Sequence, residues 1–253
     1  MIVSRSHRFL LFRNRRTGST TTHSALTKFA QGPEDLVSRT DYQDQDATPE
    51  FRQLHKIDRG RKANLPVTTL WLRTQIGNKR AFVVQRAIGR EGWKGWPQLH
   101  SHEDLRVVSR LLSRAEWREM PKLAGIREPY DWVVSLFHHR TKSSSLEGFA
   151  DWIRKVGHNL IRFELLGPSL LGDTFCVDVP IRYEAISEDL DSAALELGLH
   201  PLPSEVTKNF VLTRSARPSL DTSVYFGDDS VAVQIVQKAL SEVFDIGGYS
   251  KFP

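Results

Sequence analysis

The segment from Phe9 to Thr22, FLLFRNRRTGSTTT, constrains the fold of this chain more than any other. Its apolar run has no polar alternation, which is typical of a strand buried on both faces, and we expect that strand over Arg8–Arg13. A basic turn containing Gly18 follows, and the hydroxyl-rich residues after it begin an expected helix. A buried strand that passes through a turn into a helix predicts the α/β class.

The same turn is the first candidate binding site. A glycine lets the backbone come close to an anion, and the first amides of a helix point at it. Ser, Thr and Arg side chains add charge-assisted hydrogen bonds. The Walker A pattern G-x-x-x-x-G-K-[ST] is absent. The turn therefore favours a phosphate or sulfate ligand, and the alternative is a plain strand–turn–helix with a solvated basic turn.

Composition limits the classes of protein that fit. The chain has 253 residues, 40% of them hydrophobic and 26% charged, as in ordinary globular proteins. A formal net charge of +5 suggests an anionic ligand or surface. Cys176 is the single cysteine, so an intrachain disulfide and a Cys-rich zinc site are excluded, and its apolar neighbours predict a buried thiol. No apolar run approaches the roughly 18 residues of a membrane span, so we expect a cytoplasmic protein.

Further strands and helices alternate along the chain, which predicts one domain over residues 1–253 with a central parallel sheet and helices on both faces. Strands are expected at 122–126 and 174–183, with two β-like segments between 67 and 88. Residues 41–66 are polar and are expected to form a flexible or irregular insert. Helices are expected at 19–30, 105–119, from Pro129 onward, from a Ser144–Glu147 capping box through Val156, at 187–197 and at 231–244.

A second anion-binding segment is predicted where the strand at 122–126 ends. Arg127 comes directly after that strand, Pro129 and Asp131 suit the first turn of a helix, and Ser135 lies two helical turns further along. Ligands of parallel α/β sheets bind in the crevice at the carboxyl ends of the strands. We therefore expect this segment and the Gly18 turn to face one crevice.

These motifs together resemble those of the 3'-phosphoadenylyl sulfate (PAPS)-dependent sulfotransferases, closest to the carbohydrate-type group. Residues 16–21 (RTGSTT) are similar to the loop that holds the 5'-phosphosulfate in that family, and Arg127-Glu128-Pro129 followed by Ser135 fits its 3'-phosphate segment. Residues 181–199 and the tail VQKALSEVFDIGGYSKF are similar to two later family segments. The resemblance covers most of the chain outside about 32–90. It implies a three-layer P-loop-like fold and sulfuryl transfer from PAPS, without a metal, to a hydroxyl of a carbohydrate or other small acceptor.

The resemblance also assigns roles to residues. The PAPS-binding set would be Arg13, Arg15, Arg16, Thr17, Gly18, Ser19, Thr20, Thr21, Arg127 and Ser135. Arg16 stands where the family has a catalytic lysine. An arginine still neutralises charge, but its pKa above about 12 prevents it from donating a proton readily. The departure leaves a second hypothesis open, a PAPS-binding protein of the same fold with weak or no transfer.

Residues 93–102 contain the candidates for binding the acceptor and for removing its proton. His100 and His102 are the candidate general bases, with His100 preferred, and exposed loop histidines are the alternative. A zinc site at this His-x-His is disfavoured because further ligands with suitable spacing are missing. Trp93, Lys94 and Trp96 would form an aromatic and cationic floor for the acceptor, or else ordinary packing.

The remaining polar residues are expected to be mostly structural. We expect Tyr183 and Glu184 to brace the sheet, His138 and His139 to be solvated, and the basic loop with Lys208, Arg214 and Arg217 to be either a lid over the nucleotide or solvated surface. A nucleic-acid partner is disfavoured because no recognition motif is visible. The sequence predicts neither the identity of the acceptor nor the oligomeric state.

Overall fold

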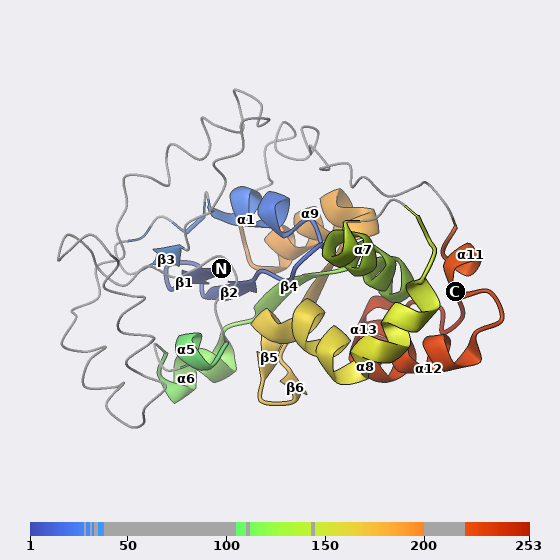
Figure 1. Cartoon of the computed structure of the whole chain (residues 1–253). Helices are drawn as coiled ribbons and strands as arrows, with labels where there is room; N and C mark the ends of the chain where they lie inside the picture. The colour runs from blue at the N-terminus through green and yellow to red at the C-terminus, as the bar shows by residue number, and fades with distance from the viewer. Residues whose placement is uncertain are drawn as a thin grey trace.

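A five-stranded mixed sheet lies at the centre of the structure, a computed structural model that describes residues 1–27, 29–30, 32, 35–37, 105–109, 112–142, 145–199 and 221–253 (Figure 1). The strand order is β3-β1-β2-β4-β7. The bounds are β1 Ile2–Ser4, β2 Phe9–Phe12, β3 Leu36–Val37, β4 Lys122–Ile126 and β7 Val179–Arg182. The α/β class expected from the sequence is therefore confirmed.

The sheet is mixed, so the expectation of a wholly parallel sheet is wrong. β2, β4 and β7 are parallel as predicted, but β1 pairs antiparallel with both β2 and β3. Only four residues separate β1 from β2, and so short a connection can join only antiparallel strands. The Asp35 carboxylate holds this turn, accepting hydrogen bonds from the backbone amides of Arg5 at 2.6 Å and Ser6 at 3.0 Å.

Both faces of the sheet are covered, as the unbroken apolar sequence of β2 predicts. Phe9 and Leu11 pack toward α1 (Ser19–Thr27) and α9 (Ile186–Glu196), which lie on one face (Figure 1). Leu10 and Phe12 pack on the other face with residues of α5 (Leu105–Val108) and with Met120. α6 (Arg114–Glu119) and the hairpin of β5 (Leu170–Leu171) and β6 (Thr174–Phe175) lie on that side too. All four β2 side chains are no more than 1% exposed.

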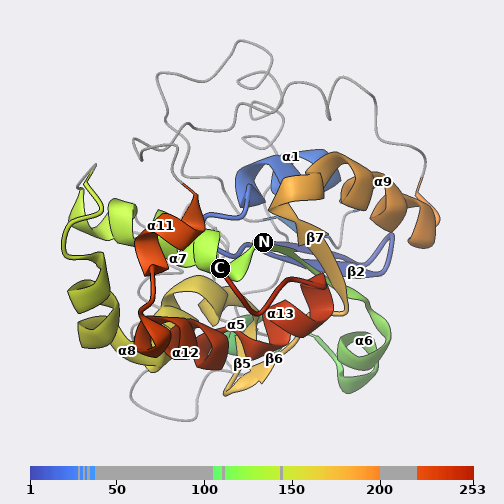
Figure 2. The same ribbon diagram turned by 90° about the vertical axis from the view of Figure 1, so that its right-hand side faces the viewer.

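A group of helices packs together beside the carboxyl ends of the parallel strands (Figure 2). These are α7 Pro129–Thr141, α8 Phe149–Leu166, α11 Thr222–Phe226, α12 Ser230–Ala239 and α13 Ser241–Gly247. Their shared core is aromatic, with Tyr130, Phe137 and Phe149 in edge-to-face contact with neighbouring rings. Two short 3₁₀ helices, Gly167–Ser169 and Tyr183–Ala185, complete the described elements.

Several helix boundaries differ from those expected. Residues 105–119 hold two helices, because Ser113 and Glu116 form a capping box that starts α6. Residues 231–244 likewise divide at Leu240 into α12 and α13. The expected helix at 19–30 ends at Thr27. At the predicted Ser144–Glu147 box, α8 instead begins after Gly148, whose φ of 77° marks a left-handed backbone.

Two further expectations change. The strand expected at 174–183 is two strands, β6 and β7. Cys176 lies between them and is half-buried, so the expected fully buried thiol is wrong, although burial still raises the pKa of the thiol. The insert at 41–66 and the β-like segments at 67–88 lie outside the described residues.

Within the described part of the chain, no helix has both the length and the apolar character needed to cross a membrane.

An ion pair between α8 and α13 makes a testable contribution to stability. Arg162 donates two hydrogen bonds to the Glu242 carboxylate, at 2.7 and 2.6 Å, and these bonds lower the pKa of Glu242 from 4.5 to about 2. Because the folded pKa is depressed, the stabilisation is complete above pH 4.5 and is lost as the pH falls through about 2. Glu242 is 39% exposed, so we discount the effect for solvent screening to about 1 kcal/mol.

We therefore expect Glu242→Gln to lower the free energy of unfolding at pH 7 by about 1 kcal/mol and to have a smaller effect near pH 2. Urea unfolding at both pH values measures this. Asp245→Asn on the same helix is the control, because Asp245 is 71% exposed and meets Lys251 at 3.4 Å. Equal losses of unfolding free energy in the two variants at pH 7 would mean that the Arg162–Glu242 ion pair does not stabilise the fold.

Candidate anion-binding site

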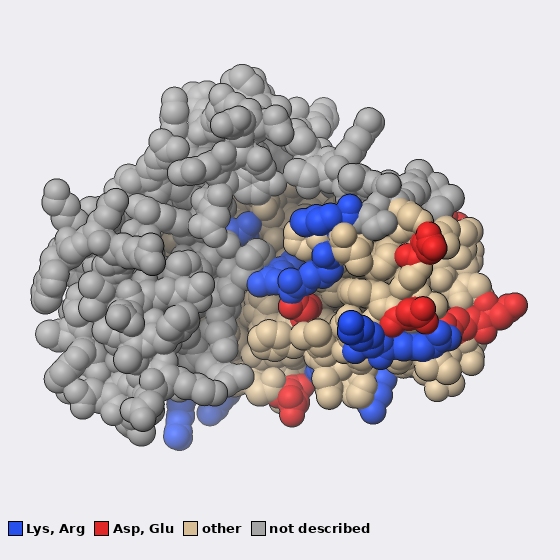
Figure 3. Space-filling model, viewed as in Figure 1, with Lys and Arg blue, Asp and Glu red and all other residues tan. Residues whose placement is uncertain are grey.

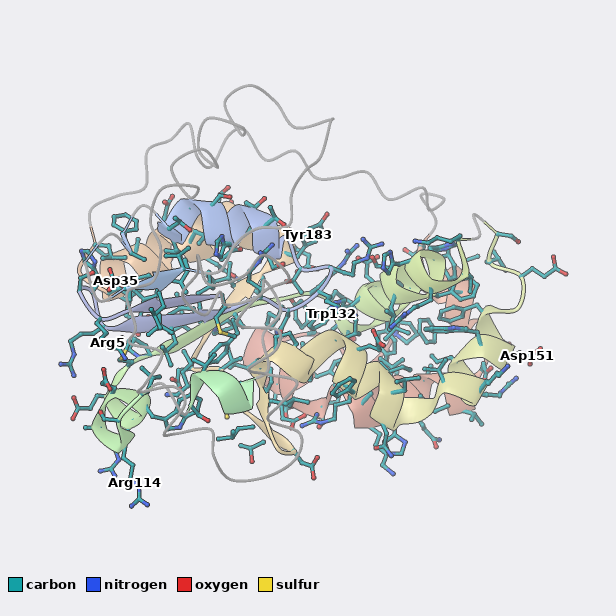
Figure 4. All side chains as sticks on the ribbon, turned by 60° about the vertical axis from the view of Figure 1, so that its left-hand side comes forward. Arg5, Asp35, Arg114, Trp132, Asp151 and Tyr183 are labelled. Atoms are coloured by element: carbon teal, nitrogen blue, oxygen red, sulfur yellow. The ribbon has the colours of Figure 1, made fainter. Side chains whose placement is uncertain are left out.

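Three parallel strands end at the same edge of the sheet, and the residues that follow them form the candidate site. Arg13 follows β2, Arg127 follows β4 and Tyr183 follows β7. The register pairs Phe12 with Ala124 and Ile126 with Arg182, so the three strand ends lie side by side. Figure 4 shows Tyr183 and Trp132 in the region between α1 and α7, away from Arg5 and Asp35 at the other end of the sheet.

The turn after β2 contains two left-handed backbone positions and leads directly into a helix. Arg16 has φ 63° and Gly18 φ 64°, both left-handed. The Gly18 carbonyl accepts the Thr22 amide at 3.1 Å, so α1 begins immediately after the turn. The amides of Ser19, Thr20 and Thr21 therefore lie in the first turn of a helix, where no preceding carbonyl is placed to accept them. Such amides, with the helix dipole, attract an anion.

Buried polar contacts fix this turn to the end of β4. The Asn14 side chain donates to the Gly125 carbonyl at 3.1 Å and accepts from the Ser169 hydroxyl at 3.0 Å. The Thr17 hydroxyl donates to the Asn14 carbonyl at 3.0 Å. Thr17 packs so closely on Gly125 that a β-carbon there would meet its Oγ1 at 2.5 Å. A glycine at this point of β4 is therefore needed for the turn to sit where it does.

Two side chains after β4 hold the same turn from the other side. The indole of Trp132 donates to the Arg15 carbonyl at 2.7 Å. The Arg127 guanidinium donates to the Arg16 carbonyl at 3.2 Å and lies over the Tyr183 ring, 4.4 Å from its centroid. The two segments that the sequence nominated separately are thus in direct contact, and Tyr183 braces them.

Arg127 has a carboxylate partner at this edge. Its Nε and Nη2 both contact the Asp131 carboxylate, one helical turn along α7, and the side chains are 11% and 19% exposed. An anion that used Arg127 would share the guanidinium with Asp131. Two other predicted residues of the site are buried: Arg13 is 3% exposed and donates to Thr20, and Ser135 is 3% exposed on α7.

The two helices that start at this edge differ in their N-termini. The Glu128 carboxylate caps α7, accepting the amides of Tyr130 at 3.1 Å and Asp131 at 2.6 Å, and burial raises its pKa. Glu184 accepts the Glu128 amide at 2.8 Å and the Tyr249 hydroxyl, and burial together with this carboxylate raises the pKa of Tyr249. The start of α7 is thus occupied by a carboxylate of the chain itself, while α1 begins with hydroxyl residues.

Basic side chains gather beside the site on the surface over α7 and the segment leading into α1 (Figure 3). The pKa of His139 is lowered by burial and by the positive charges of Arg16, Lys142, Arg140 and Arg15. Of the two histidines expected to be solvated, His139 is exposed, but His138 is buried, and its ring Nε2 is hydrogen-bonded with the Tyr225 hydroxyl at 2.8 Å.

Among the residues predicted to bind PAPS, Arg16 is hydrogen-bonded to Arg127 and Thr20 to Arg13, and the others of the first segment lie on the same turn or at the start of α1. Ser135 is buried on α7. His100, His102, Trp93, Lys94, Trp96 and the basic loop with Lys208, Arg214 and Arg217 lie outside the described residues. Sequence reasoning missed Asn14 and Trp132, which hold the turn. Asn14 carries a signal, a polar residue at the end of a buried strand, whereas the bond from Trp132 joins residues 117 apart in the sequence and has no local signal.

No family model, curated protein or solved structure matches the chain. Among the described residues, no group of three or more His, Cys, Asp or Glu is arranged to hold a metal ion. The site's chemistry is therefore argued from its own geometry, which offers helix-terminal amides, hydroxyls and guanidinium groups. These are donors suited to a phosphate or sulfate oxygen.

The contact between Thr17 and Gly125 can be tested directly. We expect Gly125→Ala to destabilise the protein by about 1–3 kcal/mol, because the new methyl group overlaps both the side chain and the carbonyl of Thr17. Thermal unfolding measures the loss. Gly167→Ala is the matched control, since the nearest atoms to a β-carbon there are 3.9 Å away. A Gly125→Ala protein as stable as the control would mean that the turn does not rest on β4.

Proposed function

We propose that the protein is a sulfotransferase of P-loop-like fold that moves a sulfuryl group from PAPS to a hydroxyl of a carbohydrate or other small acceptor. The observation that carries the proposal is the hydrogen bond from Arg127 to the Arg16 carbonyl. It joins the turn after β2 to the segment after β4, the two places that would hold the 5' and 3' ends of one nucleotide. Two anion-binding segments in contact suit a ligand with an anionic group at each end.

Different residues would bind the two anionic groups of PAPS. The amides of Ser19, Thr20 and Thr21, with the Arg16 side chain, would hold the 5'-phosphosulfate, since they are unpaired within the helix or carry positive charge. Arg127 and Ser135 would hold the 3'-phosphate. Because Asp131 also contacts Arg127, the guanidinium keeps a fixed direction, and the phosphate would meet a pre-oriented donor.

The residues of the turn also fit the demands of sulfuryl transfer. PAPS would supply the sulfuryl group, whose bond to the phosphate oxygen breaks as the acceptor oxygen bonds to sulfur, leaving adenosine 3',5'-bisphosphate. Amides at a helix N-terminus stabilise charge that develops on the transferred and leaving oxygens. Arg16 would stabilise the leaving phosphate as a fixed cation. His100 or His102 is proposed to take the proton that the acceptor hydroxyl loses.

A second candidate function is binding of PAPS or its product without efficient transfer. The presence of arginine rather than lysine at position 16 favours this second function. An arginine in place of a lysine cannot readily protonate a leaving oxygen. The fold and the nucleotide site would be the same in both proposals.

The nucleotide site is tested by calorimetric titration with adenosine 3',5'-bisphosphate. We expect binding to the native protein, and a loss of about 2–5 kcal/mol in Arg127→Ala, because a mostly buried charged donor is removed. Arg182→Ala is the matched control, since Arg182 ends the neighbouring strand β7 and pairs in the same way with Asp189 of the next helix. Equal affinities in the two variants would remove Arg127 from the site.

The two candidate functions are separated by Arg16→Lys, assayed for transfer of labelled sulfate from PAPS across sugars, phenols, lipids and peptides. We expect turnover to fall about tenfold, because lysine loses the two parallel donors of arginine. Nucleotide affinity, measured in parallel, should change less. A large gain in turnover would instead support the binding protein with weak transfer.

A further inference from the structure

Residues 248–253 follow α13 as a short tail that runs back past the start of α7 (Figure 2). The Tyr130 hydroxyl of α7 donates to the Lys251 carbonyl at 2.6 Å, and Gln237 of α12 donates to the same carbonyl at 2.7 Å. Tyr130 and Lys251 are 121 residues apart in the sequence. The tail is therefore fixed to the beginning of the helix that follows Arg127.

Tyr249 is the tail residue that packs against the strand leading to Arg127. Its ring lies directly over Gly247, where a β-carbon would meet the ring at 2.2 Å and the side chain of Ile126 at 3.0 Å. Ile126 is the last residue of β4, so the ring lies beside the residue immediately before Arg127. The Tyr249 amide donates to the Phe244 carbonyl at 3.0 Å, which fixes the start of the tail.

The Tyr249 hydroxyl is linked to the residue immediately after Arg127 through one carboxylate. Glu184 accepts the Tyr249 hydroxyl with one oxygen and the Glu128 amide with the other, both at 2.8 Å. Glu184 also directly follows Tyr183, whose ring centroid is 4.4 Å from the Arg127 guanidinium. The tail thus supports the residues on both sides of Arg127 and is bonded to the neighbour of the ring on which the guanidinium lies.

We propose that Tyr249 is a positioning residue for the nucleotide site, acting through Glu184 to hold Arg127 in the direction that meets the 3'-phosphate of the ligand. The 3'-phosphate rests on the proposed function, whereas the hold on Arg127 does not. A misplacement of about 1 Å at a binding group is enough to weaken its contacts strongly, so support on both sides of Arg127 matters for affinity. If the tail stabilised only the fold, its loss would lower stability and leave Arg127 unchanged.

The hold on Arg127 is measured without a ligand, by hydrogen exchange of its Nε–H followed by NMR and assigned with Arg127→Lys. That proton lies in the bond to Asp131. We expect Tyr249→Phe to speed the exchange about fivefold, because one supporting hydrogen bond is lost. Tyr225→Phe is the matched control and should leave the exchange unchanged, since the Tyr225 hydroxyl is also bonded at 2.8 Å, to His138 near the other end of α7. Equal exchange in the native and Tyr249→Phe proteins would overturn the proposal.

Two nucleotides show which end of the ligand the tail affects. In calorimetry, Tyr249→Phe should weaken binding of adenosine 3',5'-bisphosphate about fivefold and leave the affinity for adenosine 5'-monophosphate, which lacks the 3'-phosphate, within about twofold of native. In an Arg127→Ala background, Tyr249→Phe should have no further effect, because the two residues act as one unit. Equal weakening of both nucleotides, or a full additional loss in that background, would overturn the proposal.

Substitutions of Glu184 test the link between the tail and Arg127. Glu184→Ala removes both acceptor oxygens and should reproduce the loss of affinity and the faster exchange seen in Tyr249→Phe. Glu184→Gln keeps a hydrogen-bonding group at each position and should retain most of both. A loss in Glu184→Gln as large as in Glu184→Ala would mean that the negative charge, not the position, matters, and would overturn the proposal.

These measurements separate the positioning role from the proposed function. If the native protein binds no adenosine 3',5'-bisphosphate but Tyr249→Phe still speeds exchange at Arg127, the sulfotransferase is overturned and the positioning of Arg127 stands. If the nucleotide binds and Tyr249→Phe changes neither the exchange nor the ratio of the two affinities, the positioning role alone is overturned. Thermal unfolding of each variant shows that the differences arise in the folded state.

Discussion

The close packing of the first turn on the end of β4 is the constraint on which the rest of the site depends. Parallel pairing brings the carboxyl ends of β2 and β4 together, and Gly125 lets Thr17 approach the strand. Asn14 then ties the turn to the backbone of β4. With the turn in place, its Arg15 and Arg16 carbonyls face α7 and accept the donors of Trp132 and Arg127.

The two hydrogen bonds from Trp132 and Arg127 orient the backbone of the turn. In both, a side chain after β4 donates to a carbonyl of the turn, so the turn's carbonyls are directed toward α7. The amides that begin α1 belong to later peptide units, in the first turn of a helix, where intrahelical carbonyls do not reach them. The Glu128 carboxylate caps the start of α7, whereas the first turn of α1 contains no acidic residue. That difference supports the proposal of an anionic ligand at the turn.

Much of this arrangement could be predicted from the sequence because it is local. The unbroken apolar run of β2, the Gly18 turn and the proline that starts α7 each specify a conformation within a few residues. Strand β1 was not predicted, because three residues carry too short a pattern, and the sheet was therefore expected to be parallel throughout. The pairing of His138 with Tyr225 and of Arg127 with Asp131 and Tyr183 depends on which helices pack together, which no local pattern shows.

A crystal structure of the protein with adenosine 3',5'-bisphosphate tests the central proposition, that one ligand spans both segments. The account predicts the 5'-phosphate within hydrogen-bond distance of the Ser19–Thr21 amides and the 3'-phosphate at Arg127 and Ser135. A nucleotide seated away from this edge of the sheet, or one whose phosphates touch only one of the two segments, would contradict it.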